Sequence, residues 1–370
     1  MRRPVPVFQA LRLGQVSSFP VPSEQPGLAA PSGREPGGCY DVVGIGNALV
    51  DIVAVIEESE LALYGQPKGT MALVDSEPAD AIYAKARHLS STSGGSAANT
   101  MVGLAALGAR CAFMGRVAND SLGELFASDL AKAGVEFLSF PGGQDSSPLS
   151  TGRCLVLVTP DAERTMLTHL GAAAHLRKED LDMGALSRAR FAYLEGYLWD
   201  LPEAKDALRV AAARTHQAGG QVVLTLSDPF CVERHRSELL ELVSDGVDVL
   251  LANEAEICLL VKAHSFEDAV KEVKGLGVRC GGLTRGAQGS VVVFEDEALA
   301  VPALACEEVV DTTGAGDLYA AGFLYGLTIG ADPETCGRLG SLCAGEVISH
   351  LGARPLTPLG QLAREAGLLF

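Results

Sequence analysis

Residues 311–317, DTTGAGD, combine two carboxylates, two hydroxyls and two glycines directly before an apolar, helix-like segment, LYAAGFLYGL. Gly314 and Gly316 have no Cβ, so backbone N–H groups can turn inward there. A helix that starts at about Asp317 would add its own free N–H groups and the positive end of its dipole. Such a set of donors suits an anion, and phosphoryl-transfer chemistry uses one to hold charge on the transferred group.

Asp317 itself has two interpretations. As an acid beside a positive field, it is placed to take a proton from a nucleophile. As an Asp that follows a glycine turn, it could instead cap the helix N-terminus and be purely structural. The stretch is not the nucleotide-binding P-loop, because no Lys follows its glycines.

Other polar residues stand where predicted strands end. They occur in GIGNALVD (44–51), GGSAAN (94–99), NEAE (253–256) and LTRGAQGS (283–290), and the residues of interest are Asn47, Asp51, Gly94, Gly95, Asn99, Asn253, Glu256, Thr284, Gly286 and Gly289. Asp51 could instead be a strand-end Asp in a turn, and Asn253 and Glu256 could be a helix N-cap and a first-turn Glu. An ionised Asp among apolar residues nevertheless needs hydrogen-bond partners.

The pattern of apolar residues predicts an α/β fold. Residues 40–56 read as strand, turn and strand, and 152–171 as a hairpin around Asp161. From about residue 191, strand-like runs alternate with helical ones, which predicts a mainly parallel sheet with helices on both faces. The β-rich pieces at about 47–75 and 150–170 do not fit this alternation and predict a small separate sheet over one edge. In such a fold, ligands bind at the carboxyl ends of the strands.

Composition narrows the class of partner. The chain of 370 residues has a formal net charge of −17, which argues against a nucleic-acid or anionic-membrane binder. No uninterrupted apolar run of about 18 residues is found, so no membrane span is expected. Nine cysteines without a C-x-x-C pair indicate reduced thiols in a reducing compartment.

The first 38 residues differ from the rest, being rich in Pro, Gly and Ser, with arginines early and acids late. They are either an organellar targeting segment or a disordered tail. The chain is accordingly expected in the cytoplasm, or in a plastid or mitochondrion if residues 1–38 are a transit peptide.

Along the chain, the five motifs follow the order GIGNALVD, GGSAAN, NEAE, LTRGAQGS and DTTGAGD. In this order, over residues 40–355, they resemble the signatures of the PfkB (ribokinase-like) family of small-molecule kinases. The resemblance implies a ribokinase-like three-layer α/β/α core at 39–370, with a small β-sheet lid from about 47–75 and 150–170. It implies Asp317 as the general base and Gly314, Ala315 and Gly316 as the anion hole. It assigns the acceptor to Asn47, Asp51, Gly94, Gly95 and Asn99, ATP to Asn253, Thr284, Gly286 and Gly289, and support of Mg²⁺ to Glu256.

The same resemblance implies Mg²⁺ with ATP, and the closing stretch CAGEVISHLGARP (343–355) adds a monovalent cation such as K⁺. His350 in that stretch is expected to be a loop or packing residue. Arg285 is either a phosphate clamp or a solvated loop residue. The oligomeric state is open, because lids in this family are either free covers or dimer contacts.

The acceptor is the harder question. ERTMLTHLGAA (163–173), YLEGYL (193–198) and LSDPF (226–230) resemble segments of adenosine kinases, and Leu167, Tyr197 and Phe230 are candidates for a purine pocket or for ordinary packing. Thr313 departs from that resemblance, since adenosine kinases usually carry Asn there. The expectation is therefore phosphorylation of adenosine to AMP, with a sugar kinase of ribokinase or fructokinase type as the alternative.

Two other classes remain open. One is a non-catalytic PfkB-like regulatory protein, against which the intact Asp317 and glycine turn argue. The other is a dehydrogenase, which is disfavoured because GIGNAL lacks the third glycine of the dinucleotide-binding fingerprint and leads into another strand.

Overall fold

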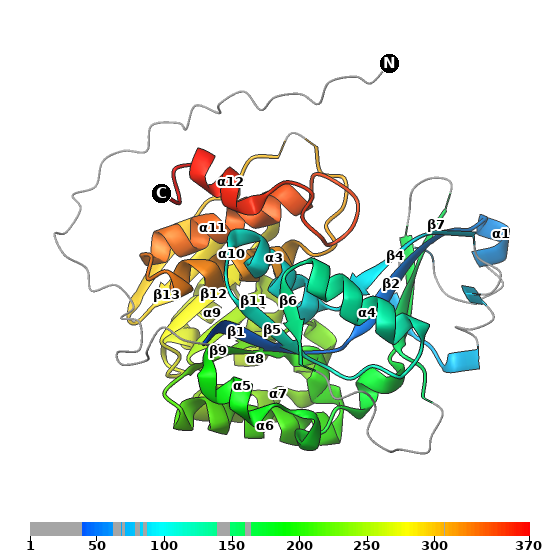
Figure 1. The fold of residues 1–370 in the computed structure, drawn as a ribbon. Coiled ribbons are helices and arrows are strands. Elements are labelled where there is room, and N and C mark those ends of the chain that lie inside the picture. Colours follow the sequence, from blue (N-terminus) through cyan, green and yellow to red (C-terminus); the bar gives the residue numbers. More distant parts are fainter. Residues whose placement is uncertain are drawn as a thin grey trace.

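The computed structural model describes residues 39–61, 68, 71–77, 82–83, 87–138, 149–159, 164–306 and 308–370 (Figure 1). The extension expected at 1–38 lies outside these residues, so its two interpretations stay predictions. Residues 62–67, 69–70 and 160–163 of the expected lid also lie outside them.

A nine-stranded sheet forms the centre of the described part of the chain, in the order β14-β13-β12-β11-β10-β9-β1-β5-β6. The strands from β12 to β6 pair in parallel, whereas β13 and β14 are antiparallel at one edge. The mainly parallel sheet is thus confirmed. Their bounds are β1 Tyr40–Ile45, β5 Cys111–Met114, β6 Val135–Phe137, β9 Ala189–Glu195, β10 Gln221–Thr225, β11 Val249–Asn253, β12 Cys280–Thr284, β13 Ser290–Phe294 and β14 Glu297–Val301.

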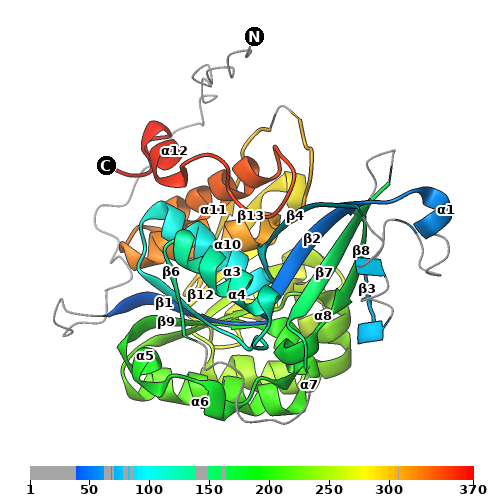
Figure 2. The same ribbon diagram turned by 45° about the vertical axis from the view of Figure 1, so that its right-hand side comes forward.

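Helices cover both faces of this sheet (Figures 1 and 2). One layer holds α3 (Ser96–Leu107), α10 (Ala315–Thr328), α11 (Pro333–Val347) and α12 (Leu359–Glu365). The other holds α5 (Met183–Arg188), α6 (Pro202–Gln217), α7 (Pro229–Gly246), α8 (Glu254–Val261) and α9 (Phe266–Lys274). Each layer buries its own apolar cluster against the sheet, as the predicted α/β/α core requires. None of the described helices is both long and apolar enough to span a bilayer.

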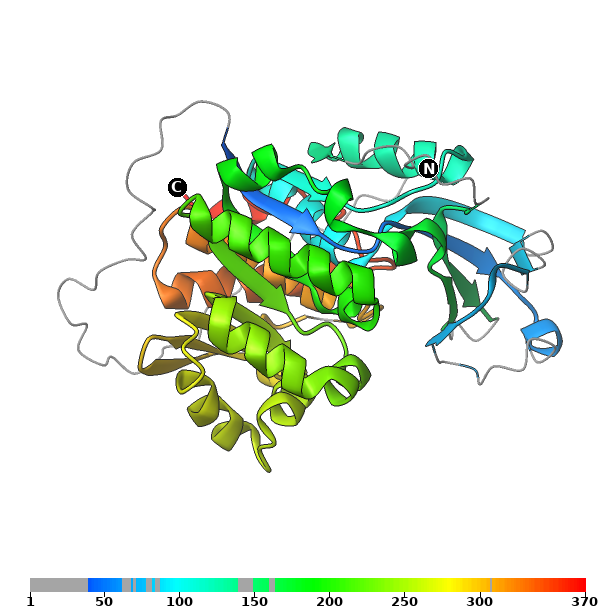
Figure 3. The ribbon, with the colours of Figure 1, turned by 90° about the horizontal axis from the view of Figure 1, so that it is seen from below.

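A second sheet of five strands, here called the lid, projects from the core (Figure 3). Its order is β3-β8-β7-β2-β4, with bounds β2 Leu49–Val55, β3 Met71–Leu73, β4 Arg87–Gly94, β7 Gly152–Val158 and β8 Arg164–His169. The hairpin β7–β8 and the separate sheet are confirmed. Strand β4 was not predicted, because its sequence RHLSSTSG is mostly polar. The short helix α1 (Glu58–Leu61) follows β2, and α4 (Ser121–Lys132) packs beside β4 and β6.

Small residues let α10 and α11 approach closely, which fixes the helix that carries Asp317. A Cβ added to Gly322 of α10 would lie 2.2 Å from the carbonyl oxygen of Leu339 in α11. Because that neighbour is backbone, it cannot move aside as a flexible side chain would.

We expect Gly322→Ala to lower the free energy of unfolding by about 1–3 kcal/mol, because the added methyl group overpacks the α10–α11 contact. Urea unfolding measures it. Gly246→Ala in the last turn of α7 is the matched control and should be neutral or slightly stabilising, because a Cβ there would have no neighbour closer than 4.0 Å. Equal stability of the two variants would contradict the close contact.

Candidate active site

The polar residues singled out above gather at the carboxyl ends of neighbouring parallel strands. Asn253 ends β11 and pairs in register with Thr284, which ends β12. Glu195 ends β9 and is opposite Thr225 of β10. Asn47 follows β1, the next strand in the sheet. The sheet therefore presents one row of polar side chains along a single edge, with the helix α10 and the lid on either side of it.

Asp317 lies in the first turn of α10, which begins at Ala315 rather than at Asp317 as predicted. Its carboxylate does not cap the helix: Gly314 is the N-cap, with φ 79° and no side-chain cap bond. Instead, Asp317 Oδ1 accepts a hydrogen bond from Ser96 Oγ (2.6 Å), and Oδ2 accepts one from Asn99 Nδ2 (2.9 Å). The carboxylate thus points across to α3, and the N-cap interpretation is wrong.

Burial raises the pKa of Asp317, while the hydrogen bonds from Ser96 and Asn99 and the charge of Arg354 oppose that rise. A raised pKa makes the ionised carboxylate a better proton acceptor near neutral pH. Each of its oxygens keeps a second lone pair for a further donor. Asp317 is therefore chemically suited to the base role.

The turn before α10 offers an anion hole that differs in one member from the predicted set. The N–H of Ala315 donates to Thr312 O (3.2 Å) and is not available. The N–H groups of Gly314, Gly316 and Asp317 have no acceptor among the described residues. A Cβ at Gly316 would meet nothing within 4 Å, so the turn is open on that side, whereas Gly314 packs against Ala353. Three backbone donors at a helix N-terminus suit an anion.

Asp51 of β2 faces the same region from the lid. A Cβ at Gly94 would lie 2.2 Å from the Asp51 carboxyl carbon, so only glycine leaves room for this side chain. Burial, and then the charge of Asp317, raise the pKa of Asp51 to about 6 against the opposing effect of Arg354. The carboxylate has no hydrogen-bond partner among the described residues, which leaves its acceptors free for a ligand.

Asn47 and Asn99 are each 5% exposed, and each has one buried oxygen, Oδ1, without a partner in the described structure. Their amide nitrogens are engaged, by Glu195 and Asp317 respectively. Gly95, with φ 92°, brings the start of α3 against Asn47, since a Cβ there would lie 2.2 Å from Asn47 O. The two free oxygens are acceptors suited to ligand hydroxyl groups.

Sequence reasoning missed Glu195, which is fully buried. Its carboxylate accepts from Asn47 N (3.2 Å), Asn47 Nδ2 (2.9 Å) and Ala97 N (2.8 Å), so it joins the end of β1 to the start of α3. Burial raises its pKa to about 7. Ser96 and Arg354 were missed as well. A glutamate ending an apolar strand, in FAYLEG, is the signal that could have indicated Glu195.

Thr284, Gly286 and Gly289 form the turn between β12 and β13, with the short 3₁₀ helix Gly286–Gln288 inside it. Gly286 and Gly289 have φ of 55° and 89°, and a Cβ at Gly289 would lie 2.2 Å from Val301 O. Arg285 pairs with Glu254 (3.2 Å) and Glu267 (3.0 Å). The Arg285 guanidinium is thus held by two carboxylates, which argues against the phosphate-clamp interpretation.

Asn253 and Glu256 form a reciprocal cap at the start of α8. Asn253 Oδ1 accepts from Glu256 N (2.9 Å), and the Glu256 carboxylate accepts from Asn253 N (3.0 Å) and Nδ2 (2.7 Å). The structural alternative is therefore present, and it does not exclude a ligand, because each carboxylate oxygen keeps a lone pair. Burial, and then the nearby charge of Asp228, raise the pKa of Glu256 to about 7.

These oxygens fit Mg²⁺ held largely through water. Mg²⁺ prefers carboxylate and amide oxygens and usually keeps several waters. A cation would also relieve the repulsion between Asp228 and Glu256. Within the described residues, no group of three or more His, Cys, Asp or Glu side chains is placed to hold a metal ion directly.

The closing stretch holds a buried oxygen that fits the expected monovalent cation. Glu346 Oε1 accepts from Leu356 N (2.9 Å) and Thr357 N (2.7 Å), whereas Oε2 has no hydrogen-bond partner in the described structure. Asp311 ties this stretch to the glycine turn by accepting from Thr313 N and Gly352 N. His350 Nε2 lies 3.3 Å from Glu346 Oε1 in the same stretch.

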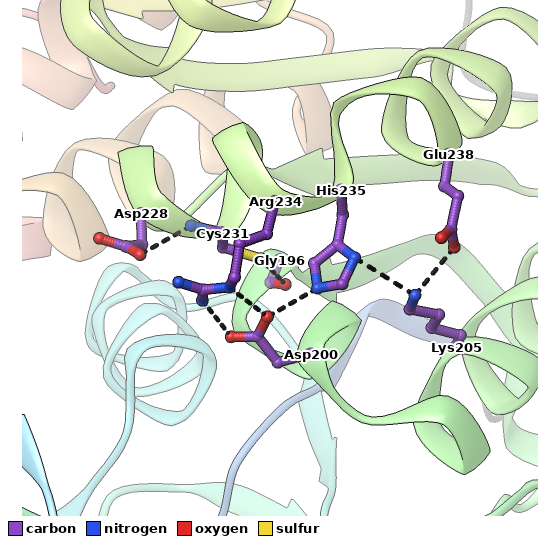
Figure 4. A network of polar contacts seen from close by, with 8 residues as sticks. All are labelled: Gly196, Asp200, Lys205, Asp228, Cys231, Arg234, His235 and Glu238. Atoms are coloured by element: carbon purple, nitrogen blue, oxygen red, sulfur yellow. Dashed lines mark hydrogen bonds and ion pairs between the residues drawn. The ribbon is translucent and has the colours of Figure 1, made fainter.

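A polar network fixes the loops after β9 and β10 (Figure 4). Asp200 accepts from Arg234 and from His235 (2.7 Å), and Lys205 bridges His235 and Glu238. Beside them, Cys231 Sγ donates to Gly196 O, and Cys231 N donates to Asp228 (2.9 Å). The network holds the loop that carries Tyr197 against the start of α7.

Ser227 lies in this region with φ 67°, a strained value for a residue with a side chain. Its Oγ accepts from Gly196 N (3.0 Å), which joins the same two loops. Backbone strain of this kind concentrates at functional sites.

The three apolar residues considered for a purine pocket differ in how far they are buried. Leu167 is 1% exposed and packs into the apolar cluster that includes Leu155, so it is not a pocket residue. Tyr197 is partly buried in the 3₁₀ helix Gly196–Asp200, and Phe230 is 68% exposed at the start of α7. A cavity of about 310 Å³ lies beside β3 and the end of β8, lined by residues 73–76, 149–150, 168–171 and 174–175.

Known proteins are similar to this chain in sequence and in fold. The family model described as pfkB family carbohydrate kinase matches residues 59–359. The adenosine kinase of Saccharomyces cerevisiae is 29% identical over 332 residues, which cover 84% of this chain and 95% of that protein.

Two solved structures are more similar in sequence. That of adenosine kinase from Sinorhizobium meliloti is 44% identical with a TM-score of 0.81, covering 89% of this chain and 100% of that one. That of a probable sugar kinase from Rhizobium etli is 41% identical with a TM-score of 0.81, covering 89% and 99%.

We expect Asp51→Asn to flatten the pH dependence of stability. The folded protein raises the pKa of Asp51 from 3.8 to about 6. The stability of the protonated form is therefore lost as pH rises through 6. Because Asn does not ionise, the variant should lose about 1–2 kcal/mol less than wild type between pH 5 and pH 8.

Urea unfolding at the two pH values measures this difference. Asp206→Asn on the exposed side of α6 is the control. It should show the wild-type pH dependence of stability, because it is remote from Asp51 and Asp317. A wild-type pH slope in Asp51→Asn would show that the Asp51 carboxyl is not desolvated.

Proposed function

This chain belongs to the PfkB family of carbohydrate kinases, and we propose that it transfers the γ-phosphoryl group of ATP to the 5′-hydroxyl of adenosine, giving AMP. The sugar-or-nucleoside kinase activity goes with the family. The choice of adenosine and the roles given to individual residues are the proposal. They rest on the site geometry and on the similarity to adenosine kinases.

The ribose is proposed to bind between the lid and α3. The Asp51 carboxylate would accept hydrogen bonds from the ring hydroxyls, because it has no protein donor among the described residues. The buried Oδ1 atoms of Asn47 and Asn99 lack partners as well. Three unsatisfied acceptors around one space require donors, and a ribose presents several hydroxyl groups to them.

The observation that favours a nucleoside is a row of residues across the lid. In register, Asp51 of β2 is opposite Cys154 of β7, Cys154 is opposite Thr168 of β8, and Thr168 is opposite Leu73 of β3. Directly opposed residues share one face of a sheet, and neighbouring strands are about 4.8 Å apart. Thr168 is thus roughly 10 Å from Asp51, and Leu73 roughly 14 Å, along the face that Asp51 presents.

Thr168 and Leu73 both line the 310 Å³ cavity. A group attached to a sugar at Asp51 and extending along this face would reach it. The volume lies at the lower end of the range of about 300–1,000 Å³ for small-molecule pockets. A plain sugar would leave this space to water, whereas a purine base would occupy it.

ATP is proposed to lie on the other half of the sheet edge. Thr284, Gly286 and Gly289 would contact its phosphates and ribose, and the cap of Asn253 and Glu256 would support the metal. Mg²⁺ bound there would neutralise charge on the phosphate oxygens. A monovalent cation near Glu346 is part of the same proposal.

Asp317 then acts on the acceptor. Its carboxylate takes the proton of the 5′-hydroxyl, the oxygen bonds to the γ-phosphorus, and the bond from that phosphorus to the bridging oxygen of ADP breaks. Free N–H groups of Gly314, Gly316 and Asp317 hold the charge that develops on the transferred group. Ser96 and Asn99 keep the Asp317 carboxylate in one orientation throughout, since each donates to one of its oxygens.

A sugar kinase is the second candidate, supported by Thr313 in place of the usual Asn and by the 41% identity to a probable sugar kinase. ATP consumption with Mg²⁺, measured with adenosine, inosine, ribose, fructose or no acceptor, separates the two. Turnover with adenosine but not with ribose or fructose supports the proposal. Turnover with a sugar overturns the nucleoside assignment and keeps the phosphoryl-transfer site. Silence with every acceptor, while ATP still binds, favours a non-catalytic protein.

We expect Asp317→Asn to lower kcat at least about a hundredfold, because the amide cannot take the proton. The dissociation constant for ATP should change little, since Asp317 contacts the acceptor side. Steady-state kinetics and ATP titration measure the two quantities. Near-normal turnover would remove Asp317 from the base role.

We expect Ala174→Phe, which places a bulky ring in the cavity, to raise the KM for adenosine at least about tenfold while any phosphorylation of ribose is retained. Ala213→Phe on the exposed side of α6 controls for the added ring. If adenosine kinetics are unchanged in Ala174→Phe, the cavity does not hold the base.

A further inference from the structure

Arg354 enters the site from the loop between α11 and α12, where no role was predicted for it. Its guanidinium donates to Ser93 O from Nε (3.2 Å) and Nη2 (2.6 Å), to Ser93 Oγ (2.9 Å) and to Ala98 O (3.1 Å). Ser93 in turn donates from N (2.9 Å) and Oγ (2.6 Å) to Asp129 Oδ2 in α4. One side chain thus binds the end of β4, the first turn of α3 and, through Ser93, α4.

These contacts fall at residues 93–98, where β4 of the lid continues into α3 of the core. This segment is here called the joint between lid and core. Strand β4 ends at Gly94, which makes room for Asp51, and α3 begins at Ser96, which donates to Asp317. The segment that Arg354 grips therefore carries the neighbours of both acids. A shift of the joint would move the acceptor carboxylate and the hydrogen-bond donors of the base relative to each other.

The charge of Arg354 also acts on both acids. It lowers the pKa of Asp51 and that of Asp317, whereas Asp317 raises the pKa of Asp51. Among the described residues, the ionisable groups that interact with Asp51, Asp317 or Arg354 are Asp129 of α4, Cys154 of β7, Tyr193 and Glu195 of β9, and Tyr197 of the following loop. Among all of these groups, Arg354 is the cation.

We propose that Arg354 is a positioning residue for the transfer reaction, which fixes the joint between lid and core and supplies a positive charge near the carboxylates of Asp51 and Asp317. The inference rests on the proposed function, because it gives Asp317 the base role. Both tasks suit a guanidinium: its planar fork reaches the carbonyl oxygens of Ser93 and Ala98 together, and it stays protonated. Lys would keep the charge but has no such fork.

The test compares Arg354→Met and Arg354→Lys with wild type across pH 5.5–9, using the acceptor that wild type phosphorylates. Arg354→Met should move the acid limb of kcat/KM to higher pH, with at least about a tenfold loss at pH 6 that shrinks at pH 8.5. Arg354→Lys should keep the wild-type pH profile and show a raised acceptor KM, because the charge remains and the joint loosens. Arg190→Met, which removes an Arg bonded to Thr328 O and Asp41, is the control and should match wild type.

A second readout does not need activity. Without the cation, ionising Asp51 and Asp317 costs more, so the free energy of unfolding of Arg354→Met should fall more steeply than that of wild type from pH 5.5 to pH 8. A parallel fall, or the same acid-limb shift in Arg354→Lys as in Arg354→Met, overturns the inference. If wild type phosphorylates no acceptor, the proposed function fails, and the unfolding slope still decides whether Arg354 holds the charge of the two acids.

Discussion

Crowded negative charge is the constraint that the rest of this site depends on. Four acids are withdrawn from water: Asp51 on β2, Glu195 at the end of β9, Asp317 in the first turn of α10 and Glu256 in the first turn of α8. Burial raises the pKa of each. Ionised groups in such surroundings require donors. The fold supplies them from different directions: backbone N–H groups at the start of α3 for Glu195, Ser96 and Asn99 for Asp317, and a helix cap for Glu256. Asp51 alone among the four has no such donor in the described structure.

That difference divides the site into fixed and open parts. Glu195 accepts three hydrogen bonds from Asn47 and Ala97, so its role is to hold Asn47 and α3 in place. Asp51 and the Oδ1 atoms of Asn47 and Asn99 are left for a ligand. The glycines at 94 and 95 make this possible, because a side chain at either position would strike Asp51 or Asn47. The residues in register with Asp51 on the same face of the lid lead to the cavity beside β3, which is where the proposed function places the purine base.

Much of this was predictable from sequence, for identifiable reasons. The buried strands and the glycine turn before α10 are local patterns, and the order of the motifs indicated the family. The polar strand β4 escaped prediction because lid pairing, not its own apolar content, makes it a strand. Glu195 and Arg354 escaped because their partners lie far along the chain: Glu195 bonds residues 47 and 97, and Arg354 bonds residues 93 and 98. Ala315 was predicted to be part of the anion hole, but its N–H donates a hydrogen bond to the carbonyl oxygen of Thr312. Leu167 was left between a pocket and ordinary packing because alternation does not say which face of a strand is covered, and the structure shows packing.

The central claim is that the acceptor lies with its ring hydroxyls at Asp51 and its hydroxymethyl group at Asp317. The position of the transferred phosphate tests this most directly. The product formed from ATP and adenosine by the wild-type enzyme would be examined by ³¹P NMR. A single 5′-monophosphate, with no phosphate on the ring hydroxyls, is the result that this geometry predicts. A 2′- or 3′-phosphate, or inorganic phosphate alone, would contradict it, because the base would then face a different hydroxyl group or only water.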